Sequence, residues 1–339
     1  MEFLSLTGGV VRMLACFGCA GVATWLGILV LGAIGFWAPL HYEEVDLAEK
    51  VKSWDEAAVR KKENNSDFTG PRMEVPSFAR KLFGKNFGKR VAAVFPLENP
   101  DDMPLLEVLV SSCAILMPMA VVTYALFCAY GETSVLAWAW GFGVYQFVRI
   151  NFFMHSMLHF RHFSSHAPLF KWRALNWLPS LFLDPLMGVP PVVFLLHHPI
   201  MHHVANNGAY DISTTEPFQR DNWVAFANYW LRFQVGAYLE LPYFAWRTNR
   251  KQWAAACVLI IGSFFYWLVY VSRNVSTFAT LAVFGVPWLY DHATDAQRNW
   301  CQHLFVSPYD HDAPVENFFD YVLFRQCPKL FSQFLKNML

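Results

Sequence analysis

Charged residues are scarce in this sequence, and their scarcity limits the kind of protein that it encodes. Only 15% of the 339 residues are Asp, Glu, Lys or Arg, whereas about a quarter is usual in a soluble domain. The formal net charge is zero, so a nucleic-acid partner is not indicated. Hydrophobic residues make up 55% of the chain, which favours a membrane protein.

The cysteine content also narrows the possibilities. The seven cysteines are scattered, mostly in apolar runs, and Cys16 and Cys19 have the CxxC spacing. That pair lies in an apolar stretch and has no second pair to complete a zinc site, so we interpret it as packing. The sequence contains no Cys-x-x-Cys-His motif for haem attachment and no GxGxxG motif for a flavin or nicotinamide. Redox chemistry would therefore need an external electron donor.

Long apolar runs predict an all-α, polytopic membrane protein. About 20 apolar residues in a helix span a bilayer. The first run, 13–40, is longer than the core of a signal peptide, so we expect it to remain as an anchor. Four further runs complete the predicted transmembrane helix bundle: residues 105–130, 135–160, 253–271 and 275–290.

The distribution of Lys and Arg predicts the orientation of these spans. Residues 41–104 contain eleven Lys or Arg, whereas the turn at 131–133 contains none and the turn at 272–274 contains one. By the positive-inside rule, we expect residues 41–104, residues 161–252 and the C-terminal tail to be cytosolic.

Two apolar stretches inside the cytosolic segment are poor candidates for straight spans. Residues 182–196 contain three prolines, and residues 223–246 are amphipathic with internal charges. Both are predicted to be interfacial or re-entrant helices along the cytosolic leaflet. An additional pair of spans is the alternative.

Ten of the twelve histidines fall in three groups beside the apolar runs. These are His155, His159, His162 and His166; then His197, His198, His202 and His203; then His292 and His303. At about 100° per residue, the first four share one face of a helix. In the second group His198 and His202 share a face, His203 is turned away, and His197 is expected near a helix start. If a helix continues past Tyr290, His292, Asp295, Asn299 and His303 form one stripe.

All three groups are predicted to lie on the cytosolic side, as a histidine-rich cap that holds metal. Imidazole is the commonest nitrogen ligand of transition metals. Neither of the first two groups contains a cysteine, which argues against structural zinc or an iron–sulfur cluster. Eight imidazoles exceed what one tetrahedral ion needs, so a pair of iron ions that activates dioxygen fits the count. Such a centre can remove hydrogen from an unactivated C–H bond of an acyl chain.

The order of these motifs resembles the membrane fatty acid desaturase/hydroxylase superfamily over roughly residues 105–305. His162-Phe-Ser-Ser-His166 resembles the first histidine box, and His198-Pro-Ile-Met-His202-His203 resembles the second with one extra residue. Asn299-Trp-Cys-Gln-His303 is similar to a ligand-bearing stretch that precedes the third box. The resemblance implies eight metal ligands, which are His155, His159, His162, His166, His198, His202, His203 and His303. Side chains that orient these imidazoles are predicted to be Asn207, Asp211 and Asn299, with Asp184 as a further candidate.

The sequence departs from the family pattern after the last span. No HxxHH or QxxHH motif follows His203, so the third box is expected to be absent or remodelled, and with it some of the ligands of one iron ion. We divide the chain into an N-terminal anchor (1–40), a cytosolic linker segment (41–104), a desaturase-like membrane domain (105–305) and an atypical C-terminal tail (306–339).

The function expected from the resemblance is that of a membrane-bound, iron- and dioxygen-dependent fatty acyl desaturase. A fatty acid hydroxylase, an alkene-forming relative and a non-catalytic homologue that regulates a complete enzyme are the alternatives. A metal transporter or hydrolase is disfavoured, because the histidines gather at one membrane face. The implied partners are an acyl lipid or fatty acid and an electron donor such as cytochrome b5 or ferredoxin. The implied location is the endoplasmic reticulum, with a plastid or bacterial inner membrane as alternatives.

Overall fold

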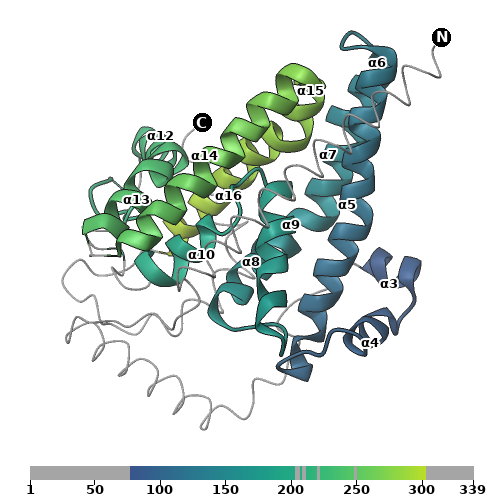
Figure 1. The fold of residues 1–339 in the computed structure, drawn as a ribbon. Coiled ribbons are helices and arrows are strands. Elements are labelled where there is room, and N and C mark those ends of the chain that lie inside the picture. The colour runs from purple at the N-terminus through teal and green to yellow at the C-terminus, as the bar shows by residue number, and fades with distance from the viewer. Residues whose placement is uncertain (1–76, 203–206, 208–210, 220–221, 248–249, 303–339) are drawn as a thin grey trace.

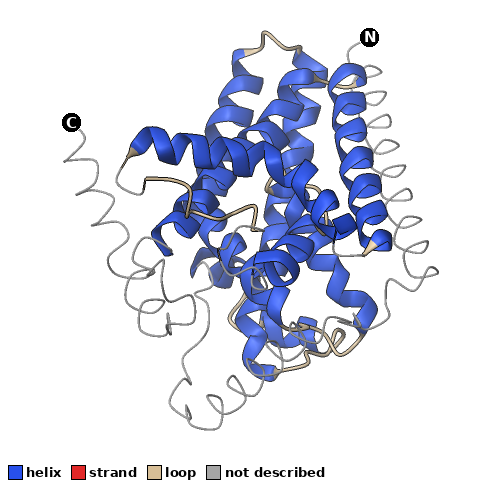
Figure 2. Ribbon diagram, turned by 90° about the vertical axis from the view of Figure 1, so that its left-hand side faces the viewer, coloured by secondary structure: helices blue, strands red, loops and turns tan. Residues whose placement is uncertain are grey.

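The described part of the chain is mostly helical. The structure is a computed structural model, and it describes residues 77–202, 207, 211–219, 222–247 and 250–302. No β-strand occurs in these ranges (Figure 2), which confirms the all-α prediction for them. The predicted anchor at 13–40 and the tail at 306–339 lie outside the described residues.

Among the described residues, two helices are long enough and apolar enough to cross a bilayer. One comprises residues Pro100–Tyr130, most of it helix α5 (Met103–Tyr130), and the other is helix α14 (Lys251–Asn274). The one acidic residue of α5, Glu107, is buried and accepts two hydrogen bonds from Arg80 of helix α3 (Ser77–Phe83), at 3.0 and 2.9 Å. A buried carboxylate needs such a partner. The charge near the edge of this apolar run is thereby compensated.

A third long helical segment runs from Val135 to His166. It consists of α6 (Val135–Trp138), a π-helical turn, α7 (Tyr145–Val148), a second π-helical turn and α8 (His155–His166). The junction residues Tyr145, Arg149 and His155 keep right-handed helical dihedrals, so the backbone does not break. This segment includes the apolar run 135–160 and ends with the first histidine group.

The last described helices form a hairpin with α14. Residues 277–302 are helical through α15 (Thr277–Thr280), a π-helical turn and α16 (Val286–Gln302). Glu132, in the turn before α6, accepts hydrogen bonds from Thr277 N at 2.9 Å and from Ser276 Oγ at 3.3 Å. The turns of both helical hairpins therefore meet at one end of the molecule, where α6 and α15 lie at the top of Figure 1.

Shorter helices precede and connect these long ones. They are α4 (Phe87–Ala92), α9 (Leu178–Leu186), α10 (Val193–His197), α12 (Trp223–Leu231) and α13 (Ala237–Arg247), and a π-helical turn (Arg232–Gly236) joins α12 to α13. Helix α13 packs along α14 (Figure 1). The stretch 187–192, which contains Pro190 and Pro191, separates α9 from α10, so the segment 182–196 is not one straight helix.

Gly188 lets the turn after α9 lie directly against the backbone of the α15–α16 segment. Its φ is +72°, and a Cβ built there would lie 2.4 Å from both Phe284 O and Trp288 N. Neither backbone atom can move alone. We expect Gly188→Ala to lower the free energy of unfolding by about 1–3 kcal/mol, from overpacking and left-handed strain. Thermal unfolding in detergent measures this, and Gly143→Ala is the control because a Cβ at that position would have no atom within 4 Å.

A charged cluster is buried between the α6–α8 and α15–α16 segments. Arg149 donates to both carboxylate oxygens of Asp291 at 2.8 Å, and the two side chains are 0% and 1% exposed. Gln146 accepts from Arg149 Nε at 3.1 Å and donates to Ala282 O at 2.6 Å. Pairing with an opposite charge is what makes such burial tolerable. The charge of Arg149, near the end of the apolar run 135–160, is thus neutralised by Asp291 of α16.

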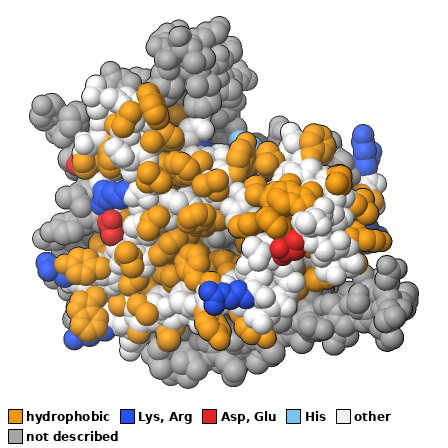
Figure 3. Space-filling view, turned by 90° about the horizontal axis from the view of Figure 1, so that it is seen from above, with side chains coloured by type: hydrophobic (Ala, Val, Ile, Leu, Met, Phe, Trp, Pro, Cys, Tyr) orange, Lys and Arg blue, Asp and Glu red, His pale blue; other side chains and the backbone are white. Residues whose placement is uncertain are grey.

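Apolar side chains cover much of the outer surface. Figure 3 shows a face dominated by hydrophobic side chains with few charges. Exposed residues include Val121 and Val122 on α5, Phe147 on α7, and Val258 and Leu259 on α14. Exposed apolar patches of this extent are uncommon on soluble monomers.

Candidate metal centre

Histidines from two segments meet at the end of α8. His162 of α8 lies beside His198, with ring centroids 4.4 Å apart. His198 and His202 begin and end a π-helical turn, and their rings stack at 5.6 Å. The structure therefore brings together three of the predicted ligands, which are separated by up to 40 positions in the sequence.

His155 and His159 lie nearer the surface. Their rings are 4.5 Å apart, and His155 is exposed. His159 Nδ1 lies 2.9 Å from His155 O, and Arg298 of α16 lies 2.7 Å from His155 Nδ1. The surroundings of these two histidines therefore differ from those of the group formed by His162, His198 and His202. The side chain of His166, and residues His203 and His303, lie outside what the structure describes.

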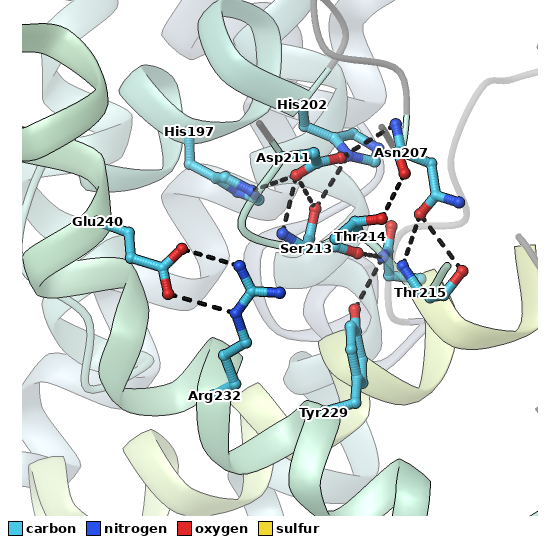
Figure 4. Close-up of polar contacts among 11 residues, drawn as sticks. His197, His202, Asn207, Asp211, Ser213, Thr214, Thr215, Tyr229, Arg232 and Glu240 are labelled. Carbon is cyan, nitrogen blue, oxygen red and sulfur yellow. Dashed lines mark hydrogen bonds and ion pairs between the residues drawn. The ribbon is translucent and has the colours of Figure 1, made fainter. Parts of the chain in front are cut away.

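Asp211 fixes the orientation of His202. Its Oδ2 lies 2.6 Å from His202 Nδ1 (Figure 4). A carboxylate at Nδ1 places the proton there and leaves Nε2 with its lone pair, as in metal-bound histidines. This contact supports the predicted orienting role of Asp211.

The carboxylate of Asp211 is already saturated by donors within its own loop. Ser213 donates to Oδ1 from its backbone N at 2.8 Å and from its Oγ at 2.6 Å, and Asn207 N donates to Oδ2 at 3.2 Å. Burial raises the pKa of Asp211, but the interactions of its carboxylate with nearby His202 and His197 outweigh burial and hold this pKa well below its usual range. An ionised carboxylate with four donors orients a ligand better than it binds a metal itself.

The loop around Asp211 is held by Asn207. This residue has a φ of +62°, a conformation that Asn tolerates better than most residues. Its Oδ1 accepts from Thr215 N at 2.8 Å, and its backbone O accepts from Thr214 Oγ1. Asn207, Asp211, Thr214 and Thr215 are all buried (Figure 4). The predicted role of Asn207 is therefore exerted through the loop.

Asn299 connects α16 to the same loop. Its Nδ2 donates to Ser213 O and to Tyr229 Oη, each at 2.8 Å. Asn299, which is 88 positions beyond Asp211 in the sequence, thus belongs to the same hydrogen-bonded cluster as Asn207 and Asp211. Asp184 lies outside this cluster. Its carboxylate accepts hydrogen bonds from Ser180 Oγ and, at 3.1 Å, from Val192 N. Asp184 therefore holds the turn before α10 and does not orient a histidine.

We expect Asp211→Ala to weaken iron retention about 10- to 100-fold, because His202 loses the group that orients it. Asp211→Asn should be intermediate, since the amide keeps the shape and one acceptor. Titration of the purified protein with a chelator measures the effect. The matched control is Glu240→Gln, which changes another carboxylate shown in Figure 4 that pairs with Arg232 at 2.9 Å. Chelator resistance equal to wild type in Asp211→Ala would contradict the orienting role.

His197 joins the site although it was not among the predicted ligands. It ends α10 instead of lying near a helix start, so that expectation is wrong. It is 6% exposed, and its Nε2 lies 3.8 Å from Asp211 Oδ1, too far for a hydrogen bond. Among the described residues, Nε2 has no hydrogen-bond partner. The sequence indicates a role for His197 only through its place in the run HHPIMHH. The spacing of that run does not show where the His197 side chain points.

The comparison with known families agrees with this arrangement. The family described as fatty acid desaturase matches residues 110–338, which is more than half of the chain. The chain belongs to the fatty acid desaturase family. No curated protein and no solved structure matches it significantly.

The residues of this desaturase-family chain fit the metal that the family implies. Ligand atoms of His197, His202 and Asp211 lie within 4.8 Å of one another. His197 Nε2 is a buried nitrogen with no partner in the described ranges, and His202 Nε2 is the nitrogen that Asp211 leaves available. Burial lowers the pKa of His197, which keeps the imidazole neutral. A neutral imidazole is the form that binds metal.

Proposed function

We propose that this chain is a membrane-bound, iron- and dioxygen-dependent fatty acyl desaturase. The observation that carries the proposal is the meeting of His162, His198 and His202, with Asp211 holding the last of them. Membership of the fatty acid desaturase family supports the substrate class. His162, His198 and His202 are the proposed metal ligands among the described residues. The same role is proposed for His155, His159, His166, His203 and His303.

A membrane topology with both hairpin turns on one side supports this function. His155 lies 20 residues beyond Val135, about 30 Å along a helix, which is the thickness of the hydrocarbon core. The turns at 131–134 and 275–276 would then face one side of the membrane and the histidines the other. We place the protein in the endoplasmic reticulum, with the histidines toward the cytosol.

Two bound iron ions would supply the oxidant that, with dioxygen, two electrons and two protons, converts –CH2–CH2– to a double bond and two waters. The chain itself orients His202 through Asp211 and restricts water by burying His197 and His198. The apolar outer surface of α5 and α14 keeps the site next to acyl chains. Electrons would come from an external donor such as cytochrome b5 or ferredoxin.

The test is the metal content and the products of the full chain. We expect about two iron ions per chain in protein purified in detergent, because imidazoles in this number suit a di-iron site. Cells that express the chain should accumulate acyl lipids with one additional double bond. A hydroxylated or terminal-alkene product would move the assignment to those alternatives, and protein without iron would contradict the proposal and support a regulatory role.

A further inference from the structure

His292 is a buried imidazole that makes no hydrogen bond to any described residue. It lies on α16, is 7% exposed, and neither Nδ1 nor Nε2 makes a hydrogen bond within the described ranges. Its neighbours are aromatic: the ring centroids of Phe233 and Trp288 lie 5.9 and 6.5 Å from its own. Burying a polar ring in this way is costly unless something binds its nitrogens.

A second buried imidazole contacts the same Phe233 ring. The centroid of the His197 ring lies 5.4 Å from that of Phe233 and 5.9 Å from that of His202, and His197 Nε2 also makes no hydrogen bond in the part of the chain described. Phe233 therefore contacts two buried histidines that each have a ring nitrogen without a hydrogen bond. One of the two, His197, also contacts His202 of the proposed centre.

The backbone around His292 is held rigidly on both sides. The preceding residue, Asp291, is fixed by Arg149 at 2.8 Å. Trp288 O accepts from Gln234 Nε2 at 2.9 Å, and Trp288 Nε1 donates to Tyr238 Oη at 3.0 Å. Further along the same helix, Asn299 donates to the loop that carries Asp211. The direction of His292 is thus set by the same helix that supports the proposed centre.

The chemical state of His292 suits a ligand. Burial, with smaller contributions from the charges of Arg161 and His197, lowers the pKa of His292 to about 3. The ring is therefore neutral near pH 7 and one nitrogen keeps its lone pair. If the residue served packing alone, an apolar side chain of similar volume would fill the place without an unpaired donor and acceptor.

We propose that His292, together with His197, ligates the metal centre as an imidazole pair outside the histidine boxes. The inference rests on the proposed function, because it assigns ligands to the same centre. His292 stands between the fifth predicted span and Asn299, so α16 would contribute a ligand of its own in addition to the predicted His303.

The experiment compares iron content and stability in His292→Leu with wild type and with His41→Ala, a histidine outside the three groups. We expect His292→Leu to lose about half of the bound iron or more, because partial shells bind poorly. The 57Fe Mössbauer spectrum should change in the same variant. After chelator treatment, His292→Leu should unfold at the same temperature as metal-free wild type or higher, because an unpaired polar ring is replaced by an apolar side chain. His197→Leu should lose iron similarly.

The outcomes separate this inference from the proposed function. Wild-type protein without iron would contradict the proposed function itself. Wild-type protein with iron, and His292→Leu with the same iron content and spectrum, would overturn the ligand role and leave His292 as a packing residue. If metal-free His292→Leu unfolds at a lower temperature than metal-free wild type, the iron loss reflects structural damage. That result also overturns the proposal, unless His292→Phe loses iron with unchanged stability.

Discussion

Replacing Arg149 with Met is expected to lower the free energy of unfolding by about 3–5 kcal/mol. The substitution removes the bidentate partner of Asp291, whose side chain is 1% exposed and cannot reach water. Gln146 would also lose its contact with Arg149 Nε. Because the pair joins α6–α8 to α15–α16, its loss should loosen the helix that carries His292 and Asn299. Unfolding in mixed detergent micelles, followed by circular dichroism, measures the change.

The control is an exposed ion pair of the same chemistry. Arg232 and Glu240 lie 2.9 Å apart, but their side chains are 33% and 39% exposed. Arg232→Met should cost about 0–1 kcal/mol, since solvent screens the pair. The double variant Arg149→Met with Asp291→Leu should recover most of the lost stability, because no charge is left buried alone. A cost for Arg149→Met as small as that for Arg232→Met would contradict the assigned strength of the buried pair.

Helical spacing was sufficient to predict the stripe on α16. A helix repeats every 3.6 residues, so His292, Asp295 and Asn299 were expected on one face. Helix α16 does continue to Gln302. The partners of these residues could not be predicted: Asp295 pairs with Arg161, 134 positions away, and Asn299 bonds to Ser213, 86 positions away. Such pairings depend on how the helices pack against one another, and helix packing cannot be derived from the spacing of residues in a single sequence.

The direction of the His197 side chain could not be predicted from residue spacing. Val192 has a φ of +69°, which is not helical, so α10 begins at the next residue, Val193. The helix ends at His197. The next turn is π-helical, with hydrogen bonds from i to i+5. The rotation per residue then differs from 100°, and projection on an ideal helix cannot give the angle between His197 and His198. The pairing of Arg149 with Asp291 could not be predicted for the same reason. A π-helical turn begins at Arg149, so the direction of its side chain does not follow from an ideal α-helix.

His162→Ala and His202→Ala are each expected to abolish iron loading without removing the protein from the membrane. His162 and His202 lie on different elements and each contacts His198, so each variant removes one neighbour of His198 from the proposed ligand set. A centre that loses an imidazole binds its metal poorly, since the remaining ligands leave open positions. Iron content of the purified variants is the measurement, with membrane fractionation to show that insertion is unchanged.

The controls separate loss of a ligand from loss of structure. His41→Ala removes a histidine outside the three groups and should keep full iron content. In His202→Ala, Ser213 and Asn207 still donate hydrogen bonds to the oxygens of Asp211. The loop should therefore persist, and the metal-free variant should unfold close to metal-free wild type. Normal iron content in either His162→Ala or His202→Ala would remove that residue from the ligand set. Because both imidazoles contact His198, normal iron content in both variants would leave only His198 of the three described ligands that carry the proposal.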